Sequence, residues 1–255
     1  MKTRMLHLQP ALALLVTACA GGNLPSDPGP AGGYRVLFIG NSLTAANDLP
    51  GTVAQLAALV NDTIVVESVT RPNLAVIDHV NGMSNAVDAI GRGHWDYVVL
   101  QQGPTSQQIG RDTLILASRL LQPDILAAGA ITAQLMVWPA AENVRLFDGV
   151  LRSCVEAAQA VDGVCFPAGE AWRAAWAVDP GLVFHGPDGF HPAPLGTYLA
   201  ALVVYEGITG HSAQSLPQEA IVSGQRLDVP GGTMVLLQRI AHETVVRYAA
   251  IRSRR

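Results

Sequence analysis

The stretch "VLFIGNSLTAAND", residues 36–48, changes character in its middle. Four apolar residues run into Gly40, Asn41 and Ser42, and the pattern then becomes helical. A short run that is apolar throughout is typical of a strand buried on both faces of a parallel sheet. In such sheets ligands bind beyond the carboxyl ends of the strands. The hydroxyl of Ser42 is therefore expected at the functional edge, with Gly40 permitting a tight turn.

The rest of the chain alternates strands with helices. We expect strands also at 63–69, 96–102, 131–139 and 164–169, and helices at 49–61, 74–91, 112–129, 142–161, 193–210 and 232–252. Asn81-Gly82 is a weak point in its helix, and Pro123 is expected to kink or divide another. This order predicts an α/β fold, a flavodoxin-like three-layer sandwich with a five-stranded parallel sheet.

Composition limits the classes of function. The chain has 255 residues, of which 49% are hydrophobic and 14% charged, so a single globular domain with a large core is expected. The net charge is −4, and the only dense cationic cluster is the terminal "IRSRR". Nucleic acid is therefore not an expected partner. We expect a monomer with no second domain.

The first residues are typical of export rather than of the fold. Residues 1–18 combine Lys2 and Arg4 with a short apolar run, as secretory signal peptides do. "VTAC", ending at Cys19, resembles the bacterial lipobox, which implies a lipidated cysteine and a membrane anchor. The alternative is an ordinary signal peptide that is cleaved near this position. Ala20 after the cysteine resembles an outer-membrane destination, if the cell has two membranes.

Export also affects what we expect of the tether, of the location of the protein and of its other cysteines. Residues 19–33 are rich in Gly and Pro and form an expected lipid-anchored tether, and residues 34–255 form the expected catalytic domain. The protein is thus expected in the cell envelope, at the outer membrane or in the periplasm of a two-membrane cell. In an oxidising compartment Cys154 and Cys165 could form a disulfide, although two buried thiols would give the same pattern.

The segment "GPDGFHPAPLG", residues 186–196, supplies what a serine nucleophile needs. Asp188 and His191 are three residues apart, so one turn can bring the carboxylate to the imidazole. The imidazole can then accept the serine proton while the carboxylate holds its tautomer. The other interpretations are a turn with a solvated acid and, for Ser42, a helix N-cap. Dinucleotide-binding, Walker and G-x-S-x-G motifs are absent.

Together, "GNSLT" (40–44) and "DGFHP" (188–192) resemble the first and fifth sequence blocks of the SGNH (GDSL-type) hydrolases, over residues 34–210. The resemblance implies that Ser42 is the nucleophile, His191 the general base and acid, and Asp188 the orienting carboxylate. It implies no metal and no organic cofactor. The segment that begins at Asp188 is similar to a bacterial subgroup of carbohydrate-directed or uncharacterised esterases.

The middle blocks depart from the family pattern, in which a glycine N–H after strand two and an asparagine after strand three help to bind the oxyanion. After the second strand, Asn73 is the nearest candidate donor. After the third, Thr105 stands where the asparagine is expected, and the amide of Gln101 or Gln102 is an alternative, of which we favour Gln102. Losing one donor typically costs about 10²–10³ in rate.

Other histidines and aromatic residues have simpler expected roles. His79 is expected to be structural, with a substrate contact as the alternative, and His185 is either a pocket residue or an ordinary loop histidine. His185 and His191 have no further ligand at metal-site spacing. Trp172 and Trp176 are four residues apart and are expected to pack in the core rather than to stack on sugars.

The resulting hypothesis is an exported serine esterase that hydrolyses short-chain acyl esters, acetyl esters above all, by a Ser-His-Asp mechanism. Its substrate would be a small-molecule or glycan ester, a class that follows from the family resemblance alone. Two alternatives remain: a non-catalytic glycan-binding surface lipoprotein, and an acyltransferase that uses the same triad.

Overall fold

The computed structural model describes residues 32–252 of the chain. The predicted signal peptide, the lipidation of Cys19 and nearly all of the predicted tether lie outside these residues and remain predictions. Among the described helices, none combines the length and the apolar character that crossing a membrane requires.

The centre of the fold is a five-stranded sheet with the order β2-β1-β3-β4-β5. All four strand pairs are parallel. The strands are β1 (Tyr34–Gly40), β2 (Ile64–Thr70), β3 (Tyr97–Leu100), β4 (Ile131–Leu135) and β5 (Val164–Phe166). This confirms the predicted α/β three-layer sandwich and its flavodoxin-like strand order.

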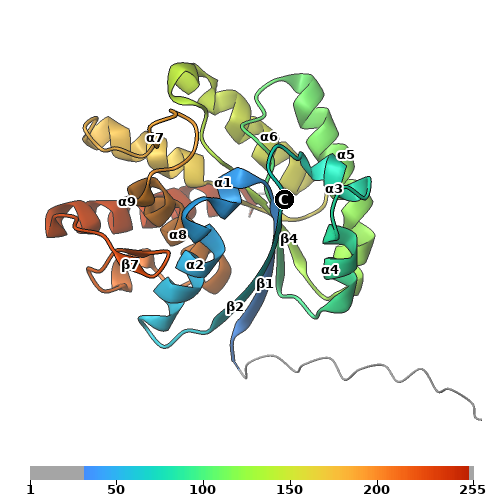
Figure 1. Cartoon of the computed structure of the whole chain (residues 1–255), viewed down its shortest axis with the longest axis horizontal. Coiled ribbons are helices and arrows are strands. Elements are labelled where there is room, and N and C mark those ends of the chain that lie inside the picture. The colour runs from blue at the N-terminus through green and yellow to red at the C-terminus, as the bar shows by residue number, and fades with distance from the viewer. Residues whose placement is uncertain (1–31, 253–255) are drawn as a thin grey trace, which may run out of the picture.

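Helices cover both faces of the sheet (Figure 1). One layer contains α1 (Ser42–Ala45), α2 (Leu49–Ala58), α7 (Ala168–Val178), α8 (Pro194–Thr209) and α9 (Gly231–Arg252). The other contains α3 (Val76–Val80), α4 (Ala86–Arg92), α5 (Gln108–Ala127) and α6 (Phe147–Gln159). A short hairpin that the sequence did not suggest, β6 (Ile221–Val222) and β7 (Gln225–Arg226), precedes α9.

The position of strand β1 between two helical layers explains why its sequence is apolar at every position instead of alternating. Val36 and Phe38 belong to the core cluster under α2 and α8, whereas Leu37 and Ile39 belong to the cluster under α4 and α5. All four side chains are fully buried. Because successive side chains of a strand point to opposite faces, a strand with a helical layer on each side must be apolar at every position.

Three predicted helices differ from the observed ones. The single helix expected at 74–91 is wrong: α3 and α4 are separate, and Gly82 between them has φ of +83°, outside the helical range. Pro123 does not divide its helix, since α5 continues to Ala127. Pro123 is exposed, so water can bond the carbonyl that lacks a donor. The helix expected at 142–161 begins instead as a 3₁₀ turn, Ala141–Leu146, before α6.

Candidate active site

The serine turn follows β1 directly and is shaped by its asparagine. Asn41 is the N-cap of α1, and its side-chain Oδ1 accepts a hydrogen bond from the Leu43 N–H at 3.1 Å. Its Nδ2 donates to the carbonyl of Leu74 at 3.0 Å, which ties the turn to the loop after β2. Ser42 is therefore not the N-cap. It is the first residue of the helix, and its hydroxyl is not used for capping.

A buried glutamine supports the same turn from β3. The Oε1 of Gln101, a residue only 1% exposed, accepts hydrogen bonds from the Asn41 N–H (3.0 Å) and the Thr44 hydroxyl (2.9 Å). A Cβ atom on Gly40 would lie 2.6 Å from this oxygen. Gly40 has no positive φ, so it is needed for the close approach of Gln101 rather than for a turn that other residues cannot adopt.

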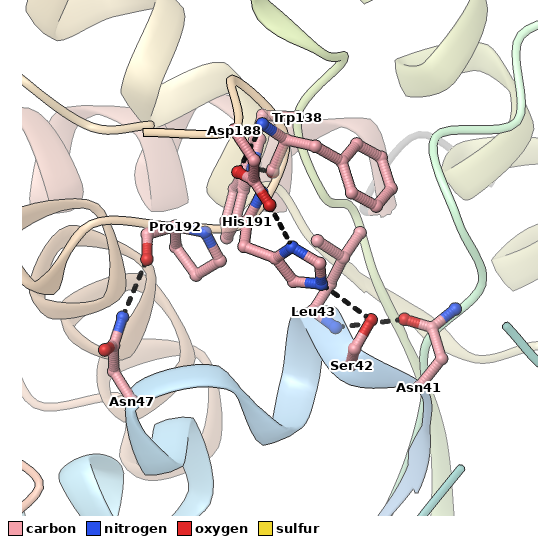
Figure 2. Close-up of polar contacts among 9 residues, drawn as sticks. Asn41, Ser42, Leu43, Asn47, Trp138, Asp188, His191 and Pro192 are labelled. Carbon is pink, nitrogen blue, oxygen red and sulfur yellow. Dashed lines mark hydrogen bonds and ion pairs between the residues drawn. The ribbon is translucent and has the colours of Figure 1, made fainter. Parts of the chain in front are cut away.

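The histidine comes from the loop between α7 and α8 and meets the serine across 149 positions of sequence. His191 Nε2 lies 2.9 Å from Ser42 Oγ, and His191 Nδ1 lies 2.6 Å from Asp188 Oδ2. Figure 2 shows the imidazole between the carboxylate and the hydroxyl, with one ring nitrogen toward each. The carboxylate, the ring and the hydroxyl thus form one continuous chain of hydrogen bonds.

The carboxylate of Asp188 is oriented by its own turn. Its Oδ1 accepts hydrogen bonds from the backbone N–H groups of Phe190 and His191, both at 3.0 Å, which leaves Oδ2 for the ring. The hydrogen bond from the His191 ring, with the two backbone donors, lowers the pKa of Asp188 to about 2. The group is therefore ionised at neutral pH and can hold an N–H at Nδ1.

Two contacts that sequence reasoning missed hold the histidine loop in place. Asn47 Nδ2 donates to the carbonyl of Pro192 at 2.8 Å (Figure 2). It also donates to Thr197 Oγ1 at 3.0 Å. Trp138 Nε1 donates to the carbonyl of Phe190 at 3.1 Å. Asn47 has φ of +52°, a conformation in which Asn is enriched among non-glycine residues. The sequence signal for it was an Asn-Asp pair just before a predicted helix, but its partner could not be read from that signal.

The three predicted oxyanion residues differ in what they already bind. Gln102 Nε2 donates to Thr105 Oγ1 (2.9 Å) and to the carbonyl of Gly110 (3.2 Å), so both of its amide hydrogens are used within the β3–α5 loop. The Thr105 hydroxyl donates to the carbonyl of Gly103 at 3.1 Å. As it stands, neither side chain has a donor to spare for a substrate.

Asn73 is in a different situation. The Leu74 N–H donates to the carbonyl of Arg71 at 3.3 Å and closes a turn in which Asn73 has φ of +63°. With Pro72 before it, this is the pattern of a type II turn, whose third position usually holds Gly or Asn. Asn73 is exposed, and the next residue, Leu74, bonds the side chain of Asn41 beside the serine. Asn73 thus lies close to the serine turn.

The remaining sequence candidates serve the surrounding structure. His79 is fully buried, with Nε2 3.0 Å from the carbonyl of Gly40 and Nδ1 2.7 Å from Ser84 Oγ. Burial lowers the pKa of His79. His185 Nε2 bonds the carbonyl of Pro139 at 2.9 Å. Trp172 is fully buried and stacks on Trp138, with ring centroids 3.6 Å apart.

Two further expectations concern sulfur and metals. Cys154 of α6 and Cys165 of β5 are joined in a disulfide, with Cα atoms 5.9 Å apart. Within residues 32–252, no three His, Cys, Asp or Glu residues are grouped as a metal site would need.

Comparison with known proteins gives structural neighbours only. No family model and no curated protein matches the sequence. Among solved structures, a DUF4886 family protein from Bacteroides uniformis has a TM-score of 0.70 at 18% identity, covering 84% of this chain and 95% of that one. A protein from Slackia heliotrinireducens, described as a proposed SGNH hydrolase, has a TM-score of 0.55 at 26% identity, covering 68% and 98%.

A third neighbour is an esterase from Pseudoalteromonas, EstA, in a structure described as inhibited by monoethylphosphonate. Its TM-score is 0.52 at 14% identity, covering 69% of this chain and 97% of that one. The fold of this chain is therefore shared, over two thirds of its length or more, with proteins described as hydrolases and esterases.

Proposed function

We propose that this chain, which belongs to the SGNH hydrolase family, is a serine esterase that hydrolyses short-chain acyl esters. The observation that carries the proposal is the hydrogen-bonded order Asp188–His191–Ser42, with each ring nitrogen of His191 engaged by a different partner. A serine hydroxyl becomes nucleophilic only beside a base, and a base is useful only when its tautomer is held.

The geometry suits a two-step acyl transfer. Ser42 Oγ attacks the ester carbonyl carbon as its proton passes to His191 Nε2, and Asp188 stabilises the imidazolium. The imidazolium returns the proton to the departing alcohol, leaving the acyl group on Ser42. Water then gives up a proton to the same nitrogen and attacks the acyl-enzyme, which releases the acid and restores the serine.

The oxyanion is held by two backbone donors in this proposal. As the first residue of α1, Ser42 has an N–H without an intrahelical acceptor. The N–H of Asn73 is the second donor, because its turn is tied to Asn41 and its left-handed conformation is one that glycine normally adopts. Gln102 and Thr105 instead maintain the β3–α5 loop through the bond between them and the bond from Thr105 to the carbonyl of Gly103.

Export and anchoring belong to the same proposal. A lipidated Cys19 would hold the domain at the cell envelope, where acyl groups on polysaccharides or cell-wall sugars are the natural substrates. The disulfide between Cys154 and Cys165 supports an oxidising compartment. Metabolic labelling with a radioactive fatty acid tests the anchor: label should enter the parent chain and be lost in Cys19→Ala.

The decisive experiment uses p-nitrophenyl acetate and butyrate, followed by a serine-directed phosphonate. The parent should hydrolyse the esters and be inactivated with one phosphonate bound, and peptide mass analysis should locate the adduct on Ser42. Ser42→Ala should lose both properties. Ser215→Ala is the matched control, because Ser215 is an exposed serine whose hydroxyl donates to the nearby Ser212 carbonyl.

Two results would overturn this function. A folded parent that neither hydrolyses esters nor forms the adduct would favour a non-catalytic glycan-binding protein. Adduct formation with acyl transfer to an added sugar in preference to water would identify an acyltransferase, since both reactions share the acyl-enzyme.

A further inference from the structure

Helix α5 has an outer side that nothing described covers. Its buried positions are Leu114, Ala117, Ser118, Leu121 and Ile125, which face the sheet. At 100° per residue, the opposite side presents Ile109, Leu116 and Leu120, which are 77%, 52% and 50% exposed. In Figure 1, α5 belongs to the layer on the far side of the sheet from α2 and α8.

These three residues, here named the α5 stripe, lie along the exposed side. Pro123 and Ala127 continue the same line and are also exposed, so it extends over about 27 Å of helix. The surface is hollowed between Ile109 and Leu116, and Asp112 lines this hollow with them. The exposed side of a surface helix normally carries charged and polar residues. A line of exposed apolar residues instead marks a contact surface.

The charged residues beside the stripe favour a partner that itself carries both an acid and a base. Asp112 and Arg119 flank it on the same side, seven residues or about two turns apart. Both are exposed, and neither forms an ion pair with any residue between 32 and 252. A two-fold axis that passes between two α5 helices, perpendicular to both and level with Leu116, would set Asp112 against Arg119 of the partner subunit, and Arg119 against Asp112 of the partner subunit.

We propose that a second copy of this chain docks on the α5 stripe, with the two α5 helices antiparallel about that axis. An interface of this type uses the same patch on both subunits, so the patch must complement itself. The stripe meets this requirement in its apolar centre and in its opposite flanking charges. The proposal replaces the monomer expected from sequence, and it does not depend on the proposed function, because the stripe contains no residue of the serine site.

A membrane surface fits the same stripe less well. Helices that lie in a membrane interface carry Lys and Arg along their polar side. One flank of the α5 stripe carries Asp112 and Arg119, and the other carries the exposed Asp124. The neighbouring Arg111 is already paired with Glu156 at 3.0 Å. An acid and a base on the same flank can pair with those of a second copy, whereas an anionic lipid surface would repel both acids.

Sedimentation velocity of the purified full chain tests the proposal. All samples use the same non-ionic detergent, over roughly 1–100 μM, the range expected for a small interface. The parent should convert from monomer to dimer as concentration rises. Leu116→Arg should weaken the dimer at least about 100-fold, since it sets two cations together at the centre. Val235→Arg, at a 46% exposed valine of α9, should leave it unchanged.

Exchanging the two charged residues tests whether the two α5 helices are antiparallel. Asp112→Arg and Arg119→Asp should each weaken the dimer about tenfold at low salt, and the double variant should regain the parent affinity within about threefold. A parent that stays monomeric, or charge reversals without effect, would overturn the proposal. So would a monomer that binds phosphatidylglycerol vesicles through Leu116, because the stripe would then be a membrane contact.

Discussion

Within residues 32–252, two clusters combine a serine, a histidine and a carboxylate, and they are built differently. In the first, at the carboxyl edge of the sheet, His191 uses Nδ1 for Asp188 and Nε2 for Ser42. The ring therefore connects the acid to the hydroxyl. Each nitrogen has one task, which is the arrangement that proton transfer requires.

The second cluster lies at the C-terminal end of α8, which contains Glu206. There a single nitrogen, His242 Nδ1, is 2.8 Å from Glu206 Oε1 and 3.1 Å from Ser212 Oγ. Glu206 is nearly buried, and its other oxygen accepts the Ala213 N–H at 2.8 Å. Both partners compete for the same side of the ring, so the histidine cannot pass a proton from serine to acid. This cluster connects α8 to α9 and to the 3₁₀ turn Ala213–Ser215.

Under the proposed function, the geometry of the ring, and not the set of residue types, distinguishes the candidate active site from the structural cluster. Exposure separates them as well: the Asp188 carboxylate is half exposed beside an accessible serine, whereas Glu206 is enclosed. A substrate can reach only the first.

Removing the histidine of each cluster should give the largest difference. His191→Ala should lower kcat for p-nitrophenyl acetate by about 10⁴-fold or more, because the base is lost. His242→Ala should leave kcat within about twofold, yet lower the free energy of unfolding by about 1–3 kcal/mol, since Glu206 loses a hydrogen-bond donor. Kinetics and urea unfolding measure the two effects. An active His191→Ala, or an inactive but folded His242→Ala, would reverse the assignment of the clusters.

The second test asks whether the serine site also has an oxyanion donor. If the donor is the backbone N–H of Asn73, Asn73→Gly should retain kcat within about threefold. Gly adopts the left-handed conformation as readily as Asn does. Replacing residue 73 by the corresponding α-hydroxy acid turns the Pro72–Asn73 amide into an ester, which removes the N–H without fixing φ, and should lower kcat about 10²–10³-fold. Gln102→Ala is the matched variant for the alternative donor. A larger loss of kcat in Gln102→Ala than in the ester variant would return the role to the glutamine.

The third test concerns the hydrogen bonds by which Asn47 joins the serine turn to the histidine loop. Asn47→Gly keeps the left-handed backbone but removes the hydrogen bonds to Pro192 and Thr197. We expect kcat to fall about tenfold with little change in KM, because the position of His191 relative to Ser42 becomes less exact. Asn61→Gly is the control, since Asn61 also has positive φ but lies before β2. Equal kinetic effects in both variants would show that Asn47 acts only through general stability.

The smallest effect should be the pH dependence contributed by Asp188. Its pKa of about 2 is below its ordinary value of 3.8, so the folded protein favours the ionised form. The resulting stabilisation is present above about pH 4 and is lost as the pH falls toward 2. The difference in Tm between the parent and Asp188→Asn should therefore shrink over that interval. A constant difference would mean that the ring does not hold the carboxylate.

Much of the fold could be predicted because the signals are local. The apolar run of β1 indicates two covered faces, and the alternation of such runs with helices indicates parallel pairing. The break in the predicted helix at 74–91 was harder to predict from the sequence. Asn81-Gly82 is only weakly unfavourable in a helix, and the decision to separate α3 from α4 depends on how each packs against α5.

The site divides in the same way. Ser42 could be proposed as a candidate from the turn after β1, because that signal is local. Asp188 and His191 were assigned to it through the resemblance of the two motifs to one family, since their spacing alone also fits an ordinary turn. Asn47 and Gln101 could not be identified as supports, since their partners are 145 and 60 positions away. The role of an amide in the chain is not visible until its acceptor is known.

By itself, the sequence determined the α/β class, the parallel sheet and a serine at its carboxyl edge, because hydrophobic periodicity reports burial locally. Only the tertiary structure decided that Asn47 and Trp138 hold the histidine loop beside that serine, and that both amide hydrogens of Gln102 are already used. It also decided that the α5 stripe faces outward. These outcomes depend on the order of the strands and on the packing of two helical layers, which bring together side chains far apart in the chain.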